Sequence, residues 1–338
     1  MEPLVFEPYL RPQIWGGRRL GERLGKRLPD RGPYGESWEI SAHPHHVSRV
    51  AEGPLAGTLL ADLWAQHARS WLGASTPPDP EFPLLIKFLD CRELLSVQVH
   101  PNDAAARRLL GEPRGKTEAW VVLDADATGR IYAGLKPGVD RAVLETHLDA
   151  GTVAECLHEF SPRPGDCILL PAGVVHAVGG GVLIAEVQQS SDATFRLFDW
   201  NRPGADGRPR PLHRRESLES IDWSAGPIRP IEAGPLPVDG DSDGNGEEAS
   251  RQRLASCAYF EIERYRLATS LVSPHDDRLS IWTVLAGEAD VHQAAAGYRR
   301  TCGPGTTLLV PAGEGPLAWT RRGDRPATLL AITLPKPN

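Results

Sequence analysis

The stretch that indicates the fold most clearly is Gly165-Asp-Cys-Ile-Leu-Leu-Pro-Ala-Gly-Val-Val-His176. In it a short run of strand residues leads into a Pro-x-Gly turn. The same spacing returns at Gly305-Thr-Thr-Leu-Leu-Val-Pro-Ala-Gly313. A similar strand precedes each copy, Trp120–Leu123 before the first and Trp282–Leu285 before the second. The repeat predicts two β-barrels of one type. The final histidine occurs in the first copy only, since Pro316 takes its position in the second.

Short strand-like runs between turn residues dominate the rest of the chain, which has 34 glycines and 31 prolines. They favour a mainly β sandwich or barrel over an α/β fold. These runs cover residues 84–89, 95–100, 119–123, 130–133, 167–170, 182–188 and 195–198. Apolar residues at helical spacing predict a few helices in the N-terminal part, at 57–72, 103–110 and 139–148.

A polar, acidic and Gly-rich stretch at residues 235–253 interrupts this pattern. It cannot bury much apolar surface, so it predicts a linker or a long exposed loop. We therefore expect a metal-binding domain with helical insertions at 1–234 and a degenerate second barrel without metal ligands at 254–338.

The composition restricts the class of protein. A net charge of −7 argues against nucleic acid or an anionic membrane as the main partner. No basic segment followed by an apolar core opens the chain, and no apolar run could span a bilayer. The five cysteines show no CxxC spacing and predict buried, reduced thiols. We expect a cytoplasmic protein.

Four residues could supply one cation with an amide oxygen, two imidazoles and a carboxylate: Gln98, His100, Glu118 and His176. Alternate residues of a strand face the same side, which supports Gln98 and His100 as a pair. This set suits zinc or a neighbouring divalent metal and leaves room for water or substrate. Gln98 is the weakest ligand type and could instead orient another ligand.

Three further charged residues lie in or beside predicted strands, namely Lys87, Glu186 and Arg196. Glu186 and Arg196 have two possible interpretations: a cross-strand ion pair on a solvated face, or a carboxylate and a guanidinium that project into the barrel beside the metal. Lys87 lies in an apolar run, so its charge must face a cavity, a partner or a sheet edge.

Several motifs in order along the chain resemble the type I phosphomannose isomerases of the cupin superfamily. The resemblance is closest to the short bacterial branch and extends from residue 14 to about residue 223. It is carried by Ile14–Gly17, Gly35–Pro44, Lys87–Asp90, Leu95–Asp103, Lys116–Trp120 and Phe195–Arg202.

The resemblance implies two cupin-type jelly-roll barrels and an interconversion of mannose 6-phosphate and fructose 6-phosphate through an enediol(ate). It implies one zinc ion per chain, with other divalent metals possible, bound by the four residues above. Arg196 would be the active-site residue, and Lys87 and Lys116 would lie near the substrate. For proton transfer the candidate is Glu186, with Lys116 as the alternative.

Two other functions fit the same metal site. One is a non-catalytic, metal-containing cupin that binds a sugar phosphate, and the other is a different metal-dependent enzyme such as a dioxygenase. Neither needs the cationic set of Lys87, Lys116 and Arg196, which therefore favours the isomerase. The expected partner is a small sugar phosphate, and the sequence predicts no oligomeric state.

Overall fold

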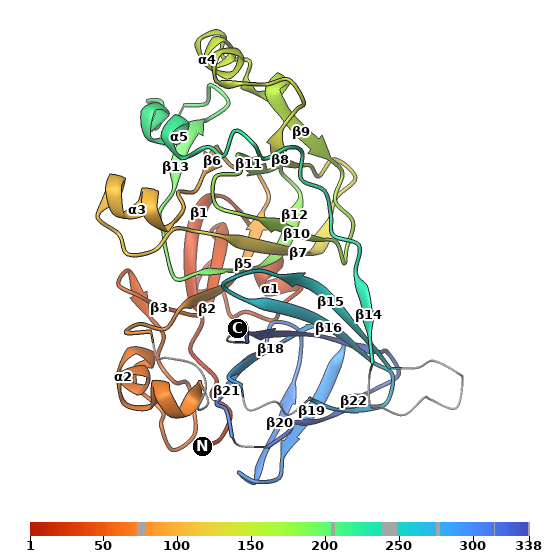
Figure 1. The fold of residues 1–338 in the computed structure, drawn as a ribbon. Helices are drawn as coiled ribbons and strands as arrows, with labels where there is room; N and C mark the ends of the chain where they lie inside the picture. The colour runs from red at the N-terminus through yellow and green to blue at the C-terminus, as the bar shows by residue number, and fades with distance from the viewer. Residues whose placement is uncertain (73–78, 204–206, 238–248, 275–277, 314, 337–338) are drawn as a thin grey trace.

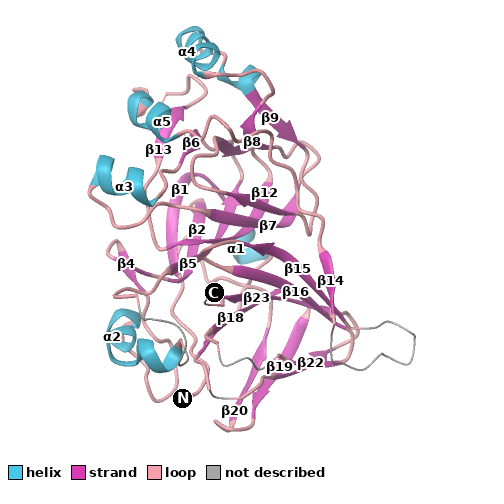
Figure 2. Cartoon of the chain, viewed as in Figure 1, coloured by secondary structure: helices cyan, strands magenta, loops and turns pink. Residues whose placement is uncertain are grey.

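The structure is a computed structural model that describes residues 1–72, 79–203, 207–237, 249–274, 278–313 and 315–336. Within them the chain is mainly β with few helices, as predicted (Figures 1 and 2). Most of the helices lie at the edge of the molecule, outside the sheets. The described helices are α1 (Arg19–Glu22), α2 (Leu60–Trp71), α3 (Asp103–Leu110), α4 (Arg141–Ala150), α5 (Arg214–Ser220) and a 3-10 turn at Val153–Cys156.

Two sheets hold the first half of the chain. Sheet I has the order β1 (Tyr9–Gly17), β2 (Tyr34–Ile40), β5 (Leu84–Cys91), β12 (Val182–Gln189), β7 (Glu118–Ala125) and β10 (Cys167–Leu170). Sheet II has the order β13 (Phe195–Phe198), β6 (Val97–Val99), β11 (His176–Val178), β8 (Ile131–Leu135) and β9 (Leu157–Phe160). A short hairpin joins β3 (Ala42–His43) to β4 (His46–Val47).

Two more sheets hold the second half of the chain. Sheet III has the order β14 (Gly234–Leu236), β15 (Ser250–Ser256), β16 (Glu261–Leu267), β23 (Ala327–Thr333), β18 (Ser280–Ala286) and β21 (Thr307–Val310). Sheet IV has the order β17 (Ser270–Val272), β22 (Ala318–Arg322), β19 (Glu288–Gln293) and β20 (Tyr298–Cys302).

The four sheets stack in the order II, I, III, IV (Figure 1), with apolar side chains packed between neighbouring sheets. Sheets I and II face each other across a cluster that includes Trp120, Ile168 and Val178. Sheets III and IV face each other across a cluster that includes Trp282 and Trp319. The two pairs are open sheets, and no closed barrel occurs among the residues described, so the barrel closure that we predicted is not found.

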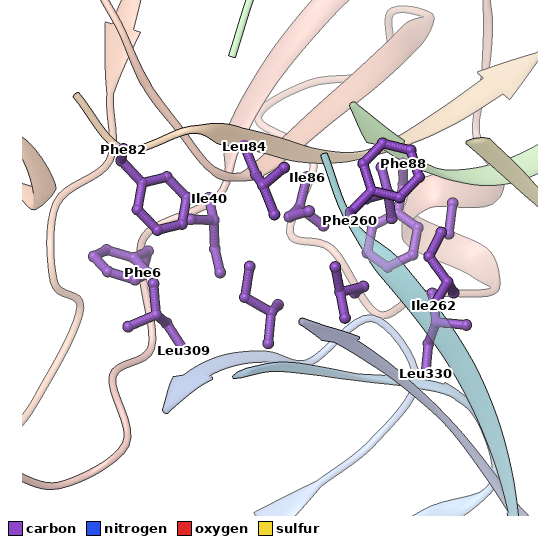
Figure 3. Close-up of a cluster of buried hydrophobic side chains, with 14 of the residues drawn as sticks. Phe6, Ile40, Phe82, Leu84, Ile86, Phe88, Phe260, Ile262, Leu309 and Leu330 are labelled. Carbon is purple, nitrogen blue, oxygen red and sulfur yellow. The ribbon is translucent and has the colours of Figure 1, made fainter. Parts of the chain in front are cut away.

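The largest apolar cluster joins sheet I to sheet III (Figure 3). Ile86 and Phe88 of β5 pack there with Ile262 of β16 and Leu330 of β23. The intervening β5 residues point the other way, toward sheet II, because side chains alternate along a strand. All eight residues of β5 are consequently buried, including the charged Lys87.

The predicted repeat is present in strand order and in register. Glu118 lies opposite Leu170 where β7 pairs with β10. Ser280 lies opposite Val310 where β18 pairs with β21. The Pro-x-Gly turns also match, since Gly173 and Gly313 both have positive φ angles, of 93° and 80°, that glycine adopts without steric cost. Sheets I and III are therefore two copies of one sheet.

The other predicted elements are found with small shifts at their ends. All seven predicted strand segments and all three predicted helices are present. The predicted linker is too long, because Pro235–Leu236 belongs to β14 and Ser250–Arg253 to β15, which pair with each other. Residues 238–248 lie outside the described part. All five cysteines are free thiols, as predicted, and all are buried except Cys257, which is half-buried. None of the described helices is long and apolar enough to cross a membrane.

Candidate metal centre

Three ligand-type side chains meet between sheets I and II. Glu118 is the first residue of β7 in sheet I, and His176 is the first residue of β11 in sheet II. His100 directly follows β6 of sheet II. Each of the three is about 1% exposed, and their ligand atoms lie within 4.8 Å of one another. The two facing sheets thus bring a carboxylate and two imidazoles to one point.

Backbone carbonyls fix the orientation of both imidazoles. Nδ1 of His100 lies 2.9 Å from the Ala193 carbonyl oxygen, and Nδ1 of His176 lies 2.8 Å from that of Val174. A carbonyl oxygen can only accept, so Nδ1 carries the proton and Nε2 carries the lone pair. Both Nε2 atoms lie 3.3 Å from an oxygen of Glu118. This is the arrangement that metal-binding histidines use.

The protonation states suit a cation. Burial lowers the pKa of His100 to about 3 and also lowers the pKa of His176, so both rings are neutral at pH 7. Burial opposes the charge on Glu118, but the Lys116 ammonium outweighs it and holds the pKa of that carboxyl well below its usual range. Metal binding requires neutral imidazole and ionised carboxylate, which are the states found here.

A divalent cation fits these residues. Nε2 of His176 is buried and has no hydrogen-bond partner among the residues described. An unsatisfied buried polar atom is costly, and a cation beside Glu118 would satisfy it. Gln98 lies directly opposite His176 where β6 pairs with β11, so both side chains leave the same face of sheet II. Two imidazoles with a carboxylate suit zinc, iron or a related metal.

A cavity of about 310 Å³ adjoins this centre. The other residues singled out from the sequence line it together with Glu118, namely Lys87, Gln98, Lys116, Glu186 and Arg196. The structure therefore brings every candidate site residue to one place.

Glu186 pairs with lysines and not with Arg196, so a cross-strand ion pair with Arg196 on a solvated face is wrong. Lys87 lies opposite Glu186 where β5 pairs with β12, and its Nζ is 3.1 Å from Oε1 of the carboxylate. Nζ of Lys116 lies 3.8 Å from the same oxygen and 2.8 Å from Oε2 of Glu118. Burial, aided by the charge of Glu118, raises the pKa of Glu186 to about 6.

Arg196 lies on β13 opposite Gln98, so it stands in one row with Gln98 and His176 across sheet II. One guanidinium nitrogen, Nη1, donates to the Pro211 carbonyl at 2.9 Å. No described carboxylate lies within ion-pair distance of Arg196, and its Nε is buried without a partner. Burial and the charge of Arg210 lower its pKa. This guanidinium can bind an anion that enters the cavity.

Several further cavity residues were missed in the sequence, among them Asp192 and Arg210. Asp192 lies in the stretch between Glu186 and Arg196 but had no distinguishing pattern. Although burial alone would raise its pKa, Lys116 and Lys87 lower it overall. Arg210 reaches the cavity because the chain folds back after β13, where the His213 N–H donates to the Arg196 carbonyl. No sequence signal marks that return.

The second copy of the fold lacks these groups. The strand register puts Ser280 at the position of Glu118 and Ala331 at the position of Glu186. The corresponding cavity is only about 50 Å³. Its walls include Arg251, which is paired with Glu263. Among the described residues, the one cluster of histidine, cysteine and acidic residues able to hold a metal is that of the first copy.

Comparison with known proteins identifies relatives of this chain. The family profile described as "Phosphomannose isomerase type I, catalytic domain" matches residues 4–118. Mannose-6-phosphate isomerase ManA of Bacillus subtilis is 33% identical over 93% of this chain and 94% of its own length. Mannose-6-phosphate isomerase of Streptococcus mutans is 35% identical over 86% and 87%.

A solved structure has the same fold as this chain. The crystal structure of the mannose 6-phosphate isomerase from Bacillus subtilis superimposes with a TM-score of 0.86 and 28% identity, covering 98% of this chain and 99% of that one.

Replacing His176 by alanine should abolish metal binding, because the site loses one of three convergent donors. We expect the affinity for zinc, measured by calorimetric titration of the metal-free protein, to fall by more than about 100-fold, the upper end for losing an outer-shell contact alone. His292→Ala, a half-buried histidine in sheet IV, is the matched control and should bind zinc as the wild type does. Unchanged zinc affinity in His176→Ala would exclude this residue as a ligand.

Proposed function

This chain belongs to the family of type I phosphomannose isomerases, and on that premise we propose that it interconverts mannose 6-phosphate and fructose 6-phosphate. We propose one zinc ion per chain as the cofactor, other divalent metals being able to replace it. The proposed ligands are Gln98, His100, Glu118 and His176.

The observation that carries this proposal is the pair of imidazoles whose Nε2 atoms face the buried carboxylate of Glu118. A metal bound there supplies a Lewis acid that polarises the carbonyl of an open-chain sugar and attracts its developing negative charge. The protein contributes the fixed orientation of the ligands through the carbonyls of Ala193 and Val174.

Proton transfer between C1 and C2 needs a base within hydrogen-bond range of the sugar carbons. We assign this role to Glu186. It lines the cavity, it is 2% exposed, and its raised pKa of about 6 makes it a better base than an ordinary carboxylate while it stays ionised at pH 7. The alternative is Lys116, whose ammonium lies between Glu118 and Glu186. Both lysines beside Glu186 would also stabilise an enediolate.

We assign the binding of the anionic substrate to Arg196, Lys87 and Lys116. Arg196 is the favoured anion ligand, because the two lysines already contact carboxylates, whereas the guanidinium of Arg196 donates to the Pro211 carbonyl alone among the described residues. A guanidinium can donate two parallel hydrogen bonds to a phosphate or to vicinal sugar oxygens.

The two pairs of facing sheets correspond, in this proposal, to two cupin-type jelly rolls. Residues 1–234 form the catalytic domain and 254–338 a second domain without metal ligands. The cavity of only about 50 Å³ in the second pair supports a non-catalytic role for it. A sugar phosphate as the substrate supports the cytoplasm as the proposed location.

The test is the conversion of mannose 6-phosphate into fructose 6-phosphate by the purified protein, measured before and after removal of metal with a chelator. We expect turnover that is lost on chelation and returns when zinc is added. No turnover by the zinc-loaded protein would contradict the isomerase function and favour a binding protein for sugar phosphates.

Arg196→Ala should keep the metal and lose turnover, because the guanidinium lies in the cavity and contacts no metal-ligand atom. We expect kcat/KM to fall by about 100-fold to 1,000-fold, as when one preorganised donor is removed from a catalytic site. Arg215→Ala on α5, whose side chain is 82% exposed, is the control and should match the wild type. Full activity of Arg196→Ala would exclude Arg196 from the site.

The pH dependence should report the ionisation of Glu186. A general base must be deprotonated, so kcat/KM should fall as the pH drops through about 6, the raised pKa of Glu186. A bound cation favours the carboxylate, so in the metal-loaded enzyme this decline should begin at or below pH 6. Glu186→Gln should lower kcat by about 100-fold to 10,000-fold and remove the acidic decline.

Zinc content must be measured at each pH, because protons compete with zinc for the ligands. If Glu186→Gln keeps its activity with an unchanged acidic decline, the base is another residue, and Lys116 is the next candidate.

A further inference from the structure

The short segment 115–117, which we call the strap, carries Lys116 into the catalytic cavity. It runs from the end of the loop after α3 to the start of β7, one residue before the ligand Glu118. Lys116 is 6% exposed, and its Nζ lies 3.1 Å from Nε2 of His100 and 2.8 Å from Oε2 of Glu118. A displacement of the strap would therefore move a charge that contacts two candidate metal ligands.

Two side chains outside the cavity hold the strap by its peptide groups. Oδ1 of Asp103 accepts a hydrogen bond from the Gly115 N–H at 2.8 Å. Oε1 of Gln189, at the end of β12, accepts from the Thr117 N–H at 2.9 Å. The Gln189 amide also donates to Oδ1 of Asp103 at 3.1 Å, so the two side chains form one connected clamp. Gln189 is 2% exposed.

Close packing leaves the strap little freedom. The Lys116 N–H donates to the carbonyl of Pro101 at 3.0 Å. A Cβ atom on Gly115 would lie 2.3 Å from that same carbonyl oxygen, so only glycine fits. The strap therefore lies directly against the residues that follow His100, and the clamp fixes Lys116 relative to both His100 and Glu118.

A residue of the second copy of the fold contacts this clamp. The hydroxyl of Tyr259, in the turn between β15 and β16, donates to Oδ2 of Asp103 at 3.3 Å. Asp103 thus accepts from the strap through one oxygen and from Tyr259 through the other. The two clamp residues and Tyr259 also line a cavity of about 590 Å³ that Glu118 and Lys116 do not line. Solvent can enter there, so removing a clamp group need not unfold the protein.

We propose that Asp103 and Gln189 are positioning residues that hold Lys116 in place for turnover, and that Tyr259 supports them from the second copy of the fold. Neither Asp103 nor Gln189 lines the cavity that holds the reacting groups, so neither is a catalytic residue. The inference rests on the isomerase function proposed above.

The test compares Asp103→Ala with Asp103→Asn in the zinc-loaded, full-length protein. The asparagine keeps an acceptor for the Gly115 N–H, whereas the alanine removes it. We expect Asp103→Ala to lower kcat by about tenfold, given that an error of about 1 Å in position can cost about 100-fold. KM and zinc content should stay near the wild-type values. Asp103→Asn should restore kcat to within about twofold. Tyr259→Phe should lower kcat less than Asp103→Ala, since the strap keeps its own hydrogen bonds.

Hydrogen exchange gives a readout that does not depend on turnover. The amide of Gly115 should exchange faster in Asp103→Ala than in the wild type, and Asp103→Asn should protect it again. Arg264→Met is the matched control, because Arg264 on β16 donates to the Gly165 carbonyl from the second copy to the first without touching the strap. It should leave kcat and the exchange of Gly115 unchanged.

A wild-type kcat in Asp103→Ala, or an equal loss of kcat in Arg264→Met, would overturn the positioning role. So would an unchanged exchange rate at Gly115. The absence of turnover in the wild type would instead overturn the proposed isomerase function, and the positioning role with it.

Discussion

The structure depends on one buried anion, the carboxylate of Glu118. Moving a carboxylate out of water costs several kcal/mol unless charges and hydrogen bonds compensate it. Here the ammonium of Lys116 lies 2.8 Å away and compensates the charge. The Nε2 atoms of His100 and His176 lie 3.3 Å away and carry lone pairs, so they repel the anion unless a cation lies between them. Because the carboxylate and the two imidazoles come from two facing sheets, sheets I and II must stack at a fixed register for one cation to contact all three. A bound cation would add the strongest compensation of all.

The two faces of sheet I carry different side chains, apolar on one face and charged on the other. Toward sheet III, β5 presents apolar side chains such as Ile86 and Phe88. Toward sheet II, the same strand presents Lys87, which pairs with Glu186. The second copy of the fold therefore has a physical role without any metal ligand of its own. It covers the apolar face of sheet I, and through Tyr259 it reaches the residues that hold the strap.

The sequence predicted the strands, three helices, the repeat and all the cavity residues that we singled out, because alternation, turn spacing and the resemblance are local patterns. It did not predict which side chains contact each other across strands that lie far apart in the sequence. Glu186 pairs with Lys87 because β5 and β12 are neighbours, although about 100 residues separate them in the chain. The two predicted barrels are not confirmed, since no closed barrel is found in the described part of the chain. The clamp residues Asp103 and Gln189 and their support Tyr259 come from three distant segments, and no local pattern connects them.

His100, His176 and Glu118 are proposed to bind one metal ion, and X-ray absorption spectroscopy of the zinc-loaded protein detects the atoms around that ion. We expect a first shell of nitrogen and oxygen at about 2.0–2.2 Å with the outer-shell signature of two imidazoles, and with no sulfur at about 2.3 Å. In His176→Ala the two-imidazole signature should be lost. A shell that contains sulfur, or one that is unchanged in His176→Ala, would exclude a metal centre made of these residues.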